Sequence, residues 1–213
     1  MISTFILKII NFFKGFDSSY SIKNKSQKEA NDIQLRLLKN LISKSDKTKF
    51  GIEHNFKKIN SYSEYIKNVP VRDYEKIKKY IELIKDGEKD ILWPGKPMYF
   101  AKTSGTTSGI KYIPITKESL KNQINSASYL LLNYLNEQKS IKSIKGKVMF
   151  ISGSPNLDNK NNIKIGRLSG IVNYHEPSYL KKILLPSKKT NKIDDWEKKI
   201  DKIVDETIGQ DLR

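Results

Sequence analysis

The sequence predicts an α/β protein in which a helical N-terminal segment precedes a domain of strands and helices. Apolar residues recur at helical spacing up to Ile84, and from residue 98 onward short apolar runs of strand composition are separated by helical stretches. A turn, Trp93-Pro-Gly-Lys-Pro97, divides the two regions. The 213 residues are enough for one domain with a sizeable core, with or without a small appendage.

Residues 1–26 are expected to form an amphipathic helix followed by a polar linker, and residues 27–213 the domain itself. The apolar stretch at residues 1–13 is interrupted by Lys8. It is also shorter than the roughly 20 residues that a membrane span requires, so no transmembrane segment is predicted. Packing of this helix on the domain is the preferred interpretation, and peripheral membrane attachment is the alternative.

Further helices are predicted before residue 90. The first runs from about Glu29 to Ser43 and has a broad apolar face: Ile33, Leu35, Leu37, Leu38, Leu41 and Ile42. Ser61 and Glu64 have the spacing of a capping box. Asp73 can cap a third helix that ends at Gly87. One side of this helix is apolar: Tyr74, Ile77, Tyr80, Ile81 and Ile84.

Strand composition occurs at residues 98–101, 111–116 and 147–151, and the last of these is expected to be a buried strand. Pro114 places the second strand at a sheet edge or end. Thr116 can cap a long helix that runs to about Glu137. Residues 156–162 are predicted to form a polar turn. A last helix carries four apolar residues, Trp196, Ile200, Ile203 and Val204.

The formal charge of +17 raises the question of nucleic-acid binding. The cations are nearly all lysine, whereas phosphate and base recognition favours arginine. Solvated lysine-rich faces, and no specific nucleic-acid partner, are therefore expected. The absence of cysteine fits a reducing, cytoplasmic location. With only His54 and His175 available, a multi-histidine metal site is excluded, and His54 is expected at the surface.

The most informative segment is residues 102–111, Lys-Thr-Ser-Gly-Thr-Thr-Ser-Gly-Ile-Lys. Its seven central residues are all glycines or carry a hydroxyl, and Lys111 adds a positive charge at the end. Glycines allow the backbone to approach a ligand closely, and consecutive N–H groups in such a loop bind anions. These are the features of a polyphosphate site. The spacing differs from that of the P-loop and from that of the dinucleotide fingerprint. Strand-like residues on both sides place the loop between two strands.

The loop resembles the first signature of the adenylate-forming superfamily, which includes acyl-CoA synthetases and luciferases. Its continuation, Lys111-Tyr-Ile-Pro-Ile-Thr116, is similar to the bacterial branch of the auxin-responsive acyl acid–amido synthetase family. Further similar segments occur in order along the chain: Phe50-Gly51, Val69-Pro-Val-Arg-Asp-Tyr74, Trp93-Pro-Gly95, Gly166-Arg-Leu-Ser-Gly170, Asp194-Asp-Trp196 and Asp205-Glu-Thr207. The resemblance implies part of the large N-terminal domain of such an enzyme.

The resemblance also implies a two-step reaction, in which ATP adenylates a carboxylic acid and an amine such as an amino acid then takes the acyl group. It assigns the ATP phosphates, with Mg²⁺, to Thr103, Ser104, Gly105, Thr106, Thr107, Ser108, Gly109 and Lys111. It assigns no metal-ligating side chain and no catalytic residue. Tyr174 and His175 are candidates for an acyl pocket, with packing or surface roles as the alternative.

The family's later motifs have no counterpart before Arg213, so the chain is expected to be an N-terminal portion that does not catalyse adenylation alone. Two other functions remain open from the sequence. An acyl-CoA ligase would share the first half-reaction and differ in using coenzyme A as acceptor. A basic nucleic-acid-binding module would bind nucleic acid tightly, with a steep dependence on salt.

Overall fold

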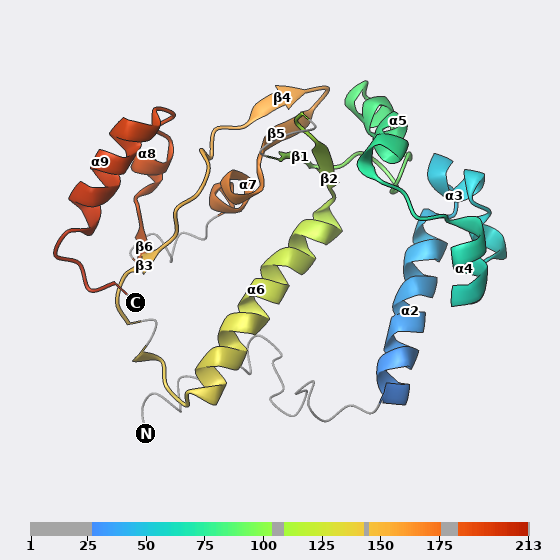
Figure 1. Ribbon diagram of the computed structural model, residues 1–213, viewed down its shortest axis with the longest axis horizontal. Coiled ribbons are helices and arrows are strands. Elements are labelled where there is room, and N and C mark those ends of the chain that lie inside the picture. Colours follow the sequence, from blue (N-terminus) through green and yellow to red (C-terminus); the bar gives the residue numbers. More distant parts are fainter. Residues whose placement is uncertain (1–26, 104–108, 143–144, 176–182, 213) are drawn as a thin grey trace. The chain divides into compact units, whose positions relative to one another are not determined.

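The computed structural model describes residues 27–103, 109–142, 145–175 and 183–212 (Figure 1). The predicted amphipathic helix and linker at residues 1–26 lie outside this range. The described residues form two compact units. The first unit holds residues 27–117 and 159–164, and the second unit holds residues 118–158 and 165–212. Helices fill the chain before residue 90 and strands follow, which confirms the predicted α/β class with its helical N-terminal segment.

The first unit begins with helices, three of which start at a side-chain N-cap. The helices are α2 (Gln27–Ser45), α3 (Lys49–Glu53), the 3-10 helix η3 (Phe56–Lys58), α4 (Tyr62–Asn68) and α5 (Tyr74–Lys85). Ser61 caps α4 as predicted, by accepting from the N–H of Glu64. The Glu64 carboxylate accepts from the N–H of Asn60, at 2.6 Å, and not from Ser61 itself. The first of the two hydrogen bonds of a capping box is therefore present, and the second comes from the residue before the cap.

Helix α5 has the predicted start, buried face and end. Asp73 caps it through the N–H of Lys76. Tyr80, Ile81 and Ile84 are buried on the predicted side. Gly87 follows with φ +99°, its N–H bonded to the carbonyl of Ile84, while the N–H of Glu88 reaches Leu83. This pair of bonds is a Schellman motif, which needs a residue in the left-handed conformation.

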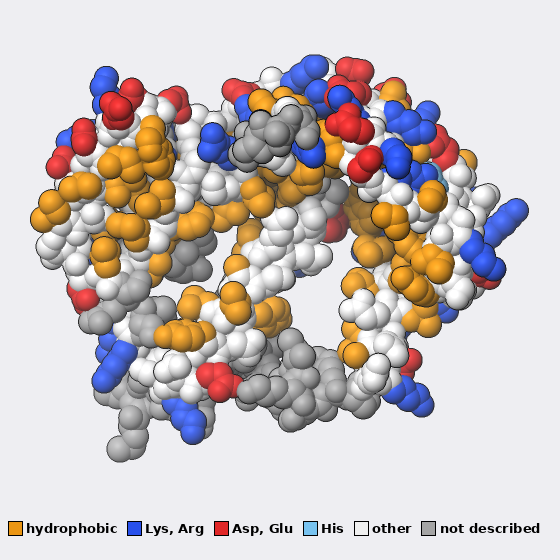
Figure 2. All heavy atoms as spheres, in the orientation of Figure 1, with side chains coloured by type: hydrophobic (Ala, Val, Ile, Leu, Met, Phe, Trp, Pro, Cys, Tyr) orange, Lys and Arg blue, Asp and Glu red, His pale blue; other side chains and the backbone are white. Residues whose placement is uncertain are grey.

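Helix α2 is less buried than its apolar face suggests. Near its end, Ile42 packs with Phe56 and Ile59 in a small core. The other apolar side chains of the face, apart from half-buried Leu38, are exposed: Ile33, Leu35, Leu37 and Leu41. Figure 2 shows hydrophobic side chains at the surface along this helix.

Strands β1 (Tyr99–Lys102) and β2 (Tyr112–Ile115) form an antiparallel hairpin in which Phe100 lies opposite Pro114. They belong to a four-stranded sheet of order β2-β1-β5-β4, with β4 at Asp158–Lys160 and β5 at Ile163–Arg167. β2 is an edge strand, as predicted from Pro114, because proline has no N–H to donate to a second neighbour.

A tight turn joins β4 to β5. Asn161 and Asn162 both have positive φ, 52° and 65°, which is the backbone of a type I′ hairpin turn. The polar turn predicted at residues 156–162 is thus confirmed at its end, while residues 158–160 form a strand.

The second unit contains most of the long helix α6 (Lys117–Glu137), together with α7 (Leu168–Tyr174), α8 (Lys188–Asn191) and α9 (Trp196–Thr207). Its buried side chains include Leu120, Leu132, Leu135, Ile171 and Ile203. α6 and α9 match the predicted helices. None of the described helices is both long enough and apolar enough to cross a bilayer.

The buried strand predicted at residues 147–151 is wrong in its burial and its length. The strand β3 covers only Val148–Met149 and pairs with β6 (Leu184–Leu185) in a two-stranded sheet. Met149, Phe150 and Ile151 are 37 to 49% exposed. Next to β3, Lys147 makes an isolated parallel bridge with Leu212, so regular pairing in this part of the chain is short.

Candidate functional site

The base of the predicted phosphate loop is held together by the β1–β2 hairpin. Beyond the last strand pair, the N–H of Thr103 donates to the carbonyl of Lys111 at 3.0 Å. The N–H of Lys111 donates in return to Thr103 Oγ1 at 3.2 Å. The hairpin therefore brings the two ends of the predicted site together. Ser104, Gly105, Thr106, Thr107 and Ser108 lie outside the described residues.

Gly109 enters the hairpin in a conformation that suits glycine. Its φ is +76°, in the left-handed region that side chains with a Cβ rarely adopt. No heavy atom would lie within 4 Å of a Cβ built at this position, so the space beside the backbone is open. No side chain at this position would keep a ligand away from the backbone.

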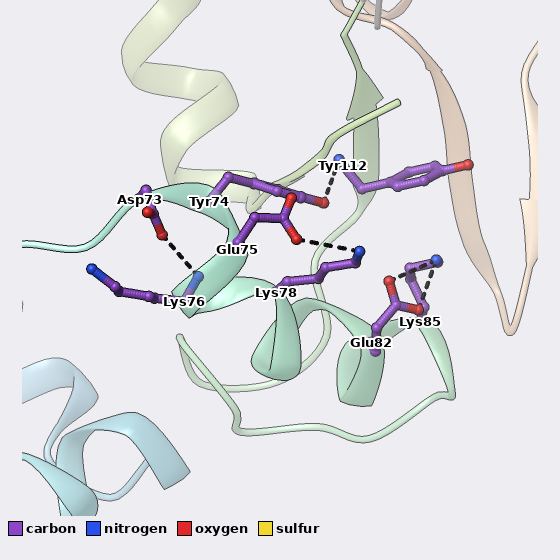
Figure 3. A network of polar contacts seen from close by, with 8 residues as sticks. All are labelled: Asp73, Tyr74, Glu75, Lys76, Lys78, Glu82, Lys85 and Tyr112. Atoms are coloured by element: carbon purple, nitrogen blue, oxygen red, sulfur yellow. Dashed lines mark hydrogen bonds and ion pairs between the residues drawn. The ribbon is translucent and has the colours of Figure 1, made fainter. Parts of the chain in front are cut away.

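Aromatic side chains support the end of the loop from α5. The Tyr74 hydroxyl accepts from the N–H of Tyr112 at 2.9 Å, which ties the start of β2 to the start of α5 (Figure 3). Lys111 Nζ lies 5.6 Å from the centre of the Tyr74 ring. The ring offers a weak cation–π contact and leaves the ammonium free to make hydrogen bonds.

Two lysines near Tyr112 differ in how far their charge is neutralised. Lys85 Nζ lies 4.6 Å from the centre of the Tyr112 ring and pairs with the Glu82 carboxylate at 2.8 Å (Figure 3). The hydrogen bond to Glu82 raises the pKa of Lys85. Lys111 has no carboxylate partner among the described residues. Of the two, Lys111 is therefore the cation available to an anionic ligand.

The described residues at the loop base fit a polyphosphate. They supply an open glycine, a threonine and an ammonium without a counter-charge, all at the end of a hairpin. The described residues contain no group of three His, Asp or Glu side chains that could hold a metal ion. A Mg²⁺ that accompanied the phosphates would accordingly take most of its ligands from them and from water, as this ion commonly does.

A second feature, in the second unit, is a pocket of about 600 Å³ between the Ser152–Ser154 segment, α7 and α9. We call it the Arg167 pocket. Its charged side chains are Arg167, Asp194 and Lys199. Its hydroxyls come from Ser152, Ser154 and Ser169, and its apolar side chains are Ile151, Ile193 and Trp196.

Close backbone packing shapes one wall of the Arg167 pocket. The N–H of Gly153 donates to the Ser169 hydroxyl at 2.9 Å. A Cβ on Gly170 would lie 2.2 Å from the Ser154 carbonyl oxygen, so only glycine allows α7 to lie so near this segment. Ser169 and Gly170 of the segment Gly166-Arg-Leu-Ser-Gly170 therefore have a structural role in holding α7 against residues 152–154.

A buried lysine forms another wall. Lys199 is only 3% exposed, and its Nζ donates to the carbonyls of Ser152 and Asn191, each at 3.0 Å. Burial lowers the pKa of Lys199; Asp194 opposes this effect and the charge of Arg167 adds to it. The Arg167 guanidinium is exposed and has no hydrogen-bond or ion-pair partner among the described residues. The pocket therefore carries two cations and one carboxylate.

The two candidates for an acyl pocket lie elsewhere in the second unit. Tyr174 ends α7 and is 41% exposed, and His175 follows it. The two rings meet edge to face at 5.5 Å, and Lys188 Nζ lies 5.9 Å from the Tyr174 ring centre. Neither side chain lines the Arg167 pocket.

The expectation that His54 is a surface residue is wrong. His54 is 6% exposed and stacks on Phe50 at 4.0 Å. Arg72 Nη2 lies 2.7 Å from its Nε2, and its Nδ1 lies 2.7 Å from the Phe50 carbonyl oxygen. Because arginine can only donate, Nε2 accepts and Nδ1 carries the proton. His54 is thus a packed residue that positions Arg72.

Sequence reasoning did not single out the Arg167 pocket. One signal was available. Lys199 follows Trp196 by three residues and precedes Ile203 by four, which places a cation on the apolar face of a helix. A lysine there must be buried with hydrogen-bond partners or reach out to solvent.

The fold is shared with acyl acid amido synthetases. A solved structure described as "GH3.15 acyl acid amido synthetase" superposes with a TM-score of 0.59 at 21% identity and covers 78% of this chain. A second, "AtGH3.15 acyl acid amido synthetase in complex with 2,4-DB", gives a TM-score of 0.56 at 22% identity and covers 75%. In each case the chain spans 29% of that structure's length.

The chain belongs to the GH3 family. The model of the GH3 family N-terminal domain matches residues 21–202. The "Indole-3-acetic acid-amido synthetase GH3.15" of Arabidopsis thaliana is 40% identical over 83 residues, which is 35% of this chain and 14% of that relative. The predicted resemblance to acyl acid–amido synthetases is confirmed.

Proposed function

We propose that this chain supplies the polyphosphate-binding part of an ATP-dependent acyl acid–amido synthetase. The relatives that it matches carry that activity in their names, and the chain spans 29% of the solved ones. The observation that carries the proposal is the hairpin base at Thr103 and Lys111, which holds together a loop of glycines and hydroxyls in a member of the GH3 family.

ATP with Mg²⁺ supplies the leaving group that activates a carboxylic acid for transfer to an amine. The residues of this chain have a simpler task. Backbone N–H groups and hydroxyls of residues 103–109 bind the β- and γ-phosphates, and Lys111 balances their charge. The Tyr74–Tyr112 hydrogen bond and the Thr103–Lys111 pair fix the two ends of the loop before the ligand arrives.

Binding of Mg²⁺–pyrophosphate to the 213-residue chain, measured by calorimetry, tests the phosphate site without requiring turnover. Lys111→Gln removes the charge at the loop end. A hydrogen bond between charged groups contributes about 1.5–3 kcal/mol, so the affinity should fall about tenfold or more.

The matched control is Lys76→Gln. Lys76 is exposed on α5, and only its backbone N–H takes part in the cap on that helix (Figure 3). Both substitutions remove one unit of charge, so general attraction to this basic chain changes equally in the two. If K76Q weakens pyrophosphate binding as much as K111Q does, the loop is not the site and the proposal fails.

The enzymatic part of the proposal has its own test. We expect the chain by itself to bind pyrophosphate and to show no carboxylate-dependent ATP–pyrophosphate exchange, because it spans under a third of its solved relatives. Exchange by the 213-residue chain would contradict this expectation and would place the whole adenylating site within these residues.

A further inference from the structure

We propose that the Arg167 pocket binds a small organic carboxylate with an apolar body. The inference rests on the proposed function in one respect, since the acyl acid and the amino acid of such a synthetase both carry a carboxylate. It assigns a second ligand site, in residues that take no part in the phosphate loop.

The cations of the pocket call for an anion. Lys199 is almost completely buried, and two carbonyls occupy two of its three N–H groups. Lys199 therefore contributes a positive charge, and two of its three donors are already used by the fold. Arg167 adds a guanidinium without a partner among the described residues, and its planar fork matches a carboxylate. Arg167 and Lys199 both line the pocket, so an anion bound there meets two positive charges.

The remaining walls fix the rest of the ligand. Ile151, Ile193 and Trp196 give an apolar surface on which an aliphatic or aromatic group can pack. The volume of about 600 Å³ lies within the range of small-molecule sites, which is about 300–1,000 Å³. A bare inorganic anion would leave this apolar surface in contact with water, so an organic acid is the better fit.

Asp194 lets the pocket distinguish two kinds of carboxylate. An amino acid could place its ammonium near this side chain, whereas a simple acid has nothing to offer it. L-phenylalanine and 3-phenylpropionate form a matched pair, because they differ only in the amino group. 3-Phenylpropionamide is the neutral counterpart that lacks the carboxylate.

Binding is measured by tryptophan emission in the Trp93→Phe chain. The sequence holds two tryptophans, so Trp196 on the pocket wall becomes the only reporter. We expect saturable binding of 3-phenylpropionate or L-phenylalanine and none of the amide. Arg167→Gln should weaken binding about tenfold or more, as the loss of a charge-assisted hydrogen bond predicts. Arg167 is exposed, so this variant is expected to fold.

The control variant is Lys198→Gln, which removes one positive charge from the neighbouring, exposed position of α9. Its affinity for 3-phenylpropionate or L-phenylalanine should match that of the Trp93→Phe parent chain. Equal binding of the amide and the acid would overturn the proposal, and so would equal weakening by R167Q and K198Q. Asp194→Asn identifies the ligand class: it weakens L-phenylalanine alone if the acceptor amine binds here, and it strengthens 3-phenylpropionate if the acyl acid does.

The measurement separates this proposal from the proposed function. Neither ATP nor pyrophosphate is present, and Lys111 does not line the pocket. If the chain binds pyrophosphate through Lys111 but binds no carboxylate, only the proposed ligand of the Arg167 pocket is refuted. A chain that binds the carboxylate and not pyrophosphate would refute the phosphate site alone.

Discussion

Gly170→Ala should destabilise the second unit and disturb the Arg167 pocket. A Cβ at this position would lie 2.2 Å from the Ser154 carbonyl oxygen and 3.1 Å from its carbonyl carbon, whereas ordinary contact begins at 3.4 Å. The obstacle is backbone, so α7 and the Ser152–Ser154 segment must separate by about 1 Å. The same movement would stretch the hydrogen bond between Gly153 and Ser169.

The expected magnitude is a balance of two effects. Overpacking costs about 1–3 kcal/mol, and because the obstacle here is backbone at 2.2 Å the upper end, about 2–3 kcal/mol, applies. Alanine gains about 1 kcal/mol over glycine in a helix. We expect a net loss in the free energy of unfolding of roughly 1–2 kcal/mol. With an m-value of about 1–3 kcal/mol per molar in urea, the midpoint of urea unfolding should fall by roughly 1 M.

Urea unfolding followed by Trp196 emission in the Trp93→Phe chain reports on the unit that contains Gly170. Gly166→Ala is the matched comparison, four residues earlier. Its Cβ would lie 2.4 Å from Leu157 Cδ2, the tip of a flexible side chain that can rotate away, so its cost should be smaller. A G170A midpoint at or above that of the parent would refute the reasoning, because it would mean that the two segments are not in close contact.

Three further outcomes are expected. Burial alone would raise the pKa of Glu206, but hydrogen bonds from Thr190 and Ser187 outweigh it and the pKa is lowered. The stability that the Glu206 carboxylate contributes is therefore fully present above pH 4.5, its usual pKa, and is lost as the pH falls through the lower pKa of the folded protein. When urea midpoints are measured against pH, Glu206→Gln should therefore reduce the fall in midpoint on the acid side. Asp73→Ala removes the α5 cap and should cost about 1 kcal/mol in urea unfolding; an unchanged midpoint would count against the cap. Tyr74→Phe removes the acceptor for the N–H of Tyr112, so hydrogen exchange of that amide should accelerate about fivefold; unaltered protection would mean that the bond is not maintained in solution.

Several features of the candidate site followed from the sequence because they depend on neighbours a few residues apart. The Asp73 cap and the apolar side of α5 are set by spacing within one helix. Pro114 lacks an N–H wherever it stands, so its strand had to lie at an edge or an end of the sheet. The glycines and hydroxyls of residues 103–109, flanked by strand-like residues, predicted a loop between two strands. The β1–β2 hairpin confirms that arrangement.

Burial could not be predicted in the same way, because it depends on segments that are distant in the sequence. His54 is covered by Phe50 and Arg72, and the second of these comes from 18 residues further along. Residues 147–151 have the composition of a core strand, yet only Val148–Met149 form one and the Phe150 side chain is 37% exposed.

The sequence by itself indicated the family, the N-caps of α4 and α5, and the loop between β1 and β2, since each depends on a short run of residues. Only the tertiary structure decided that Arg167 and Lys199, 32 residues apart in the chain, line one pocket. The physical reason is that a lysine at a helical position can lie in solvent or in the interior with equal local propensity. Its place is fixed by the carbonyls of Ser152 and Asn191, which come to Lys199 only when the second unit folds.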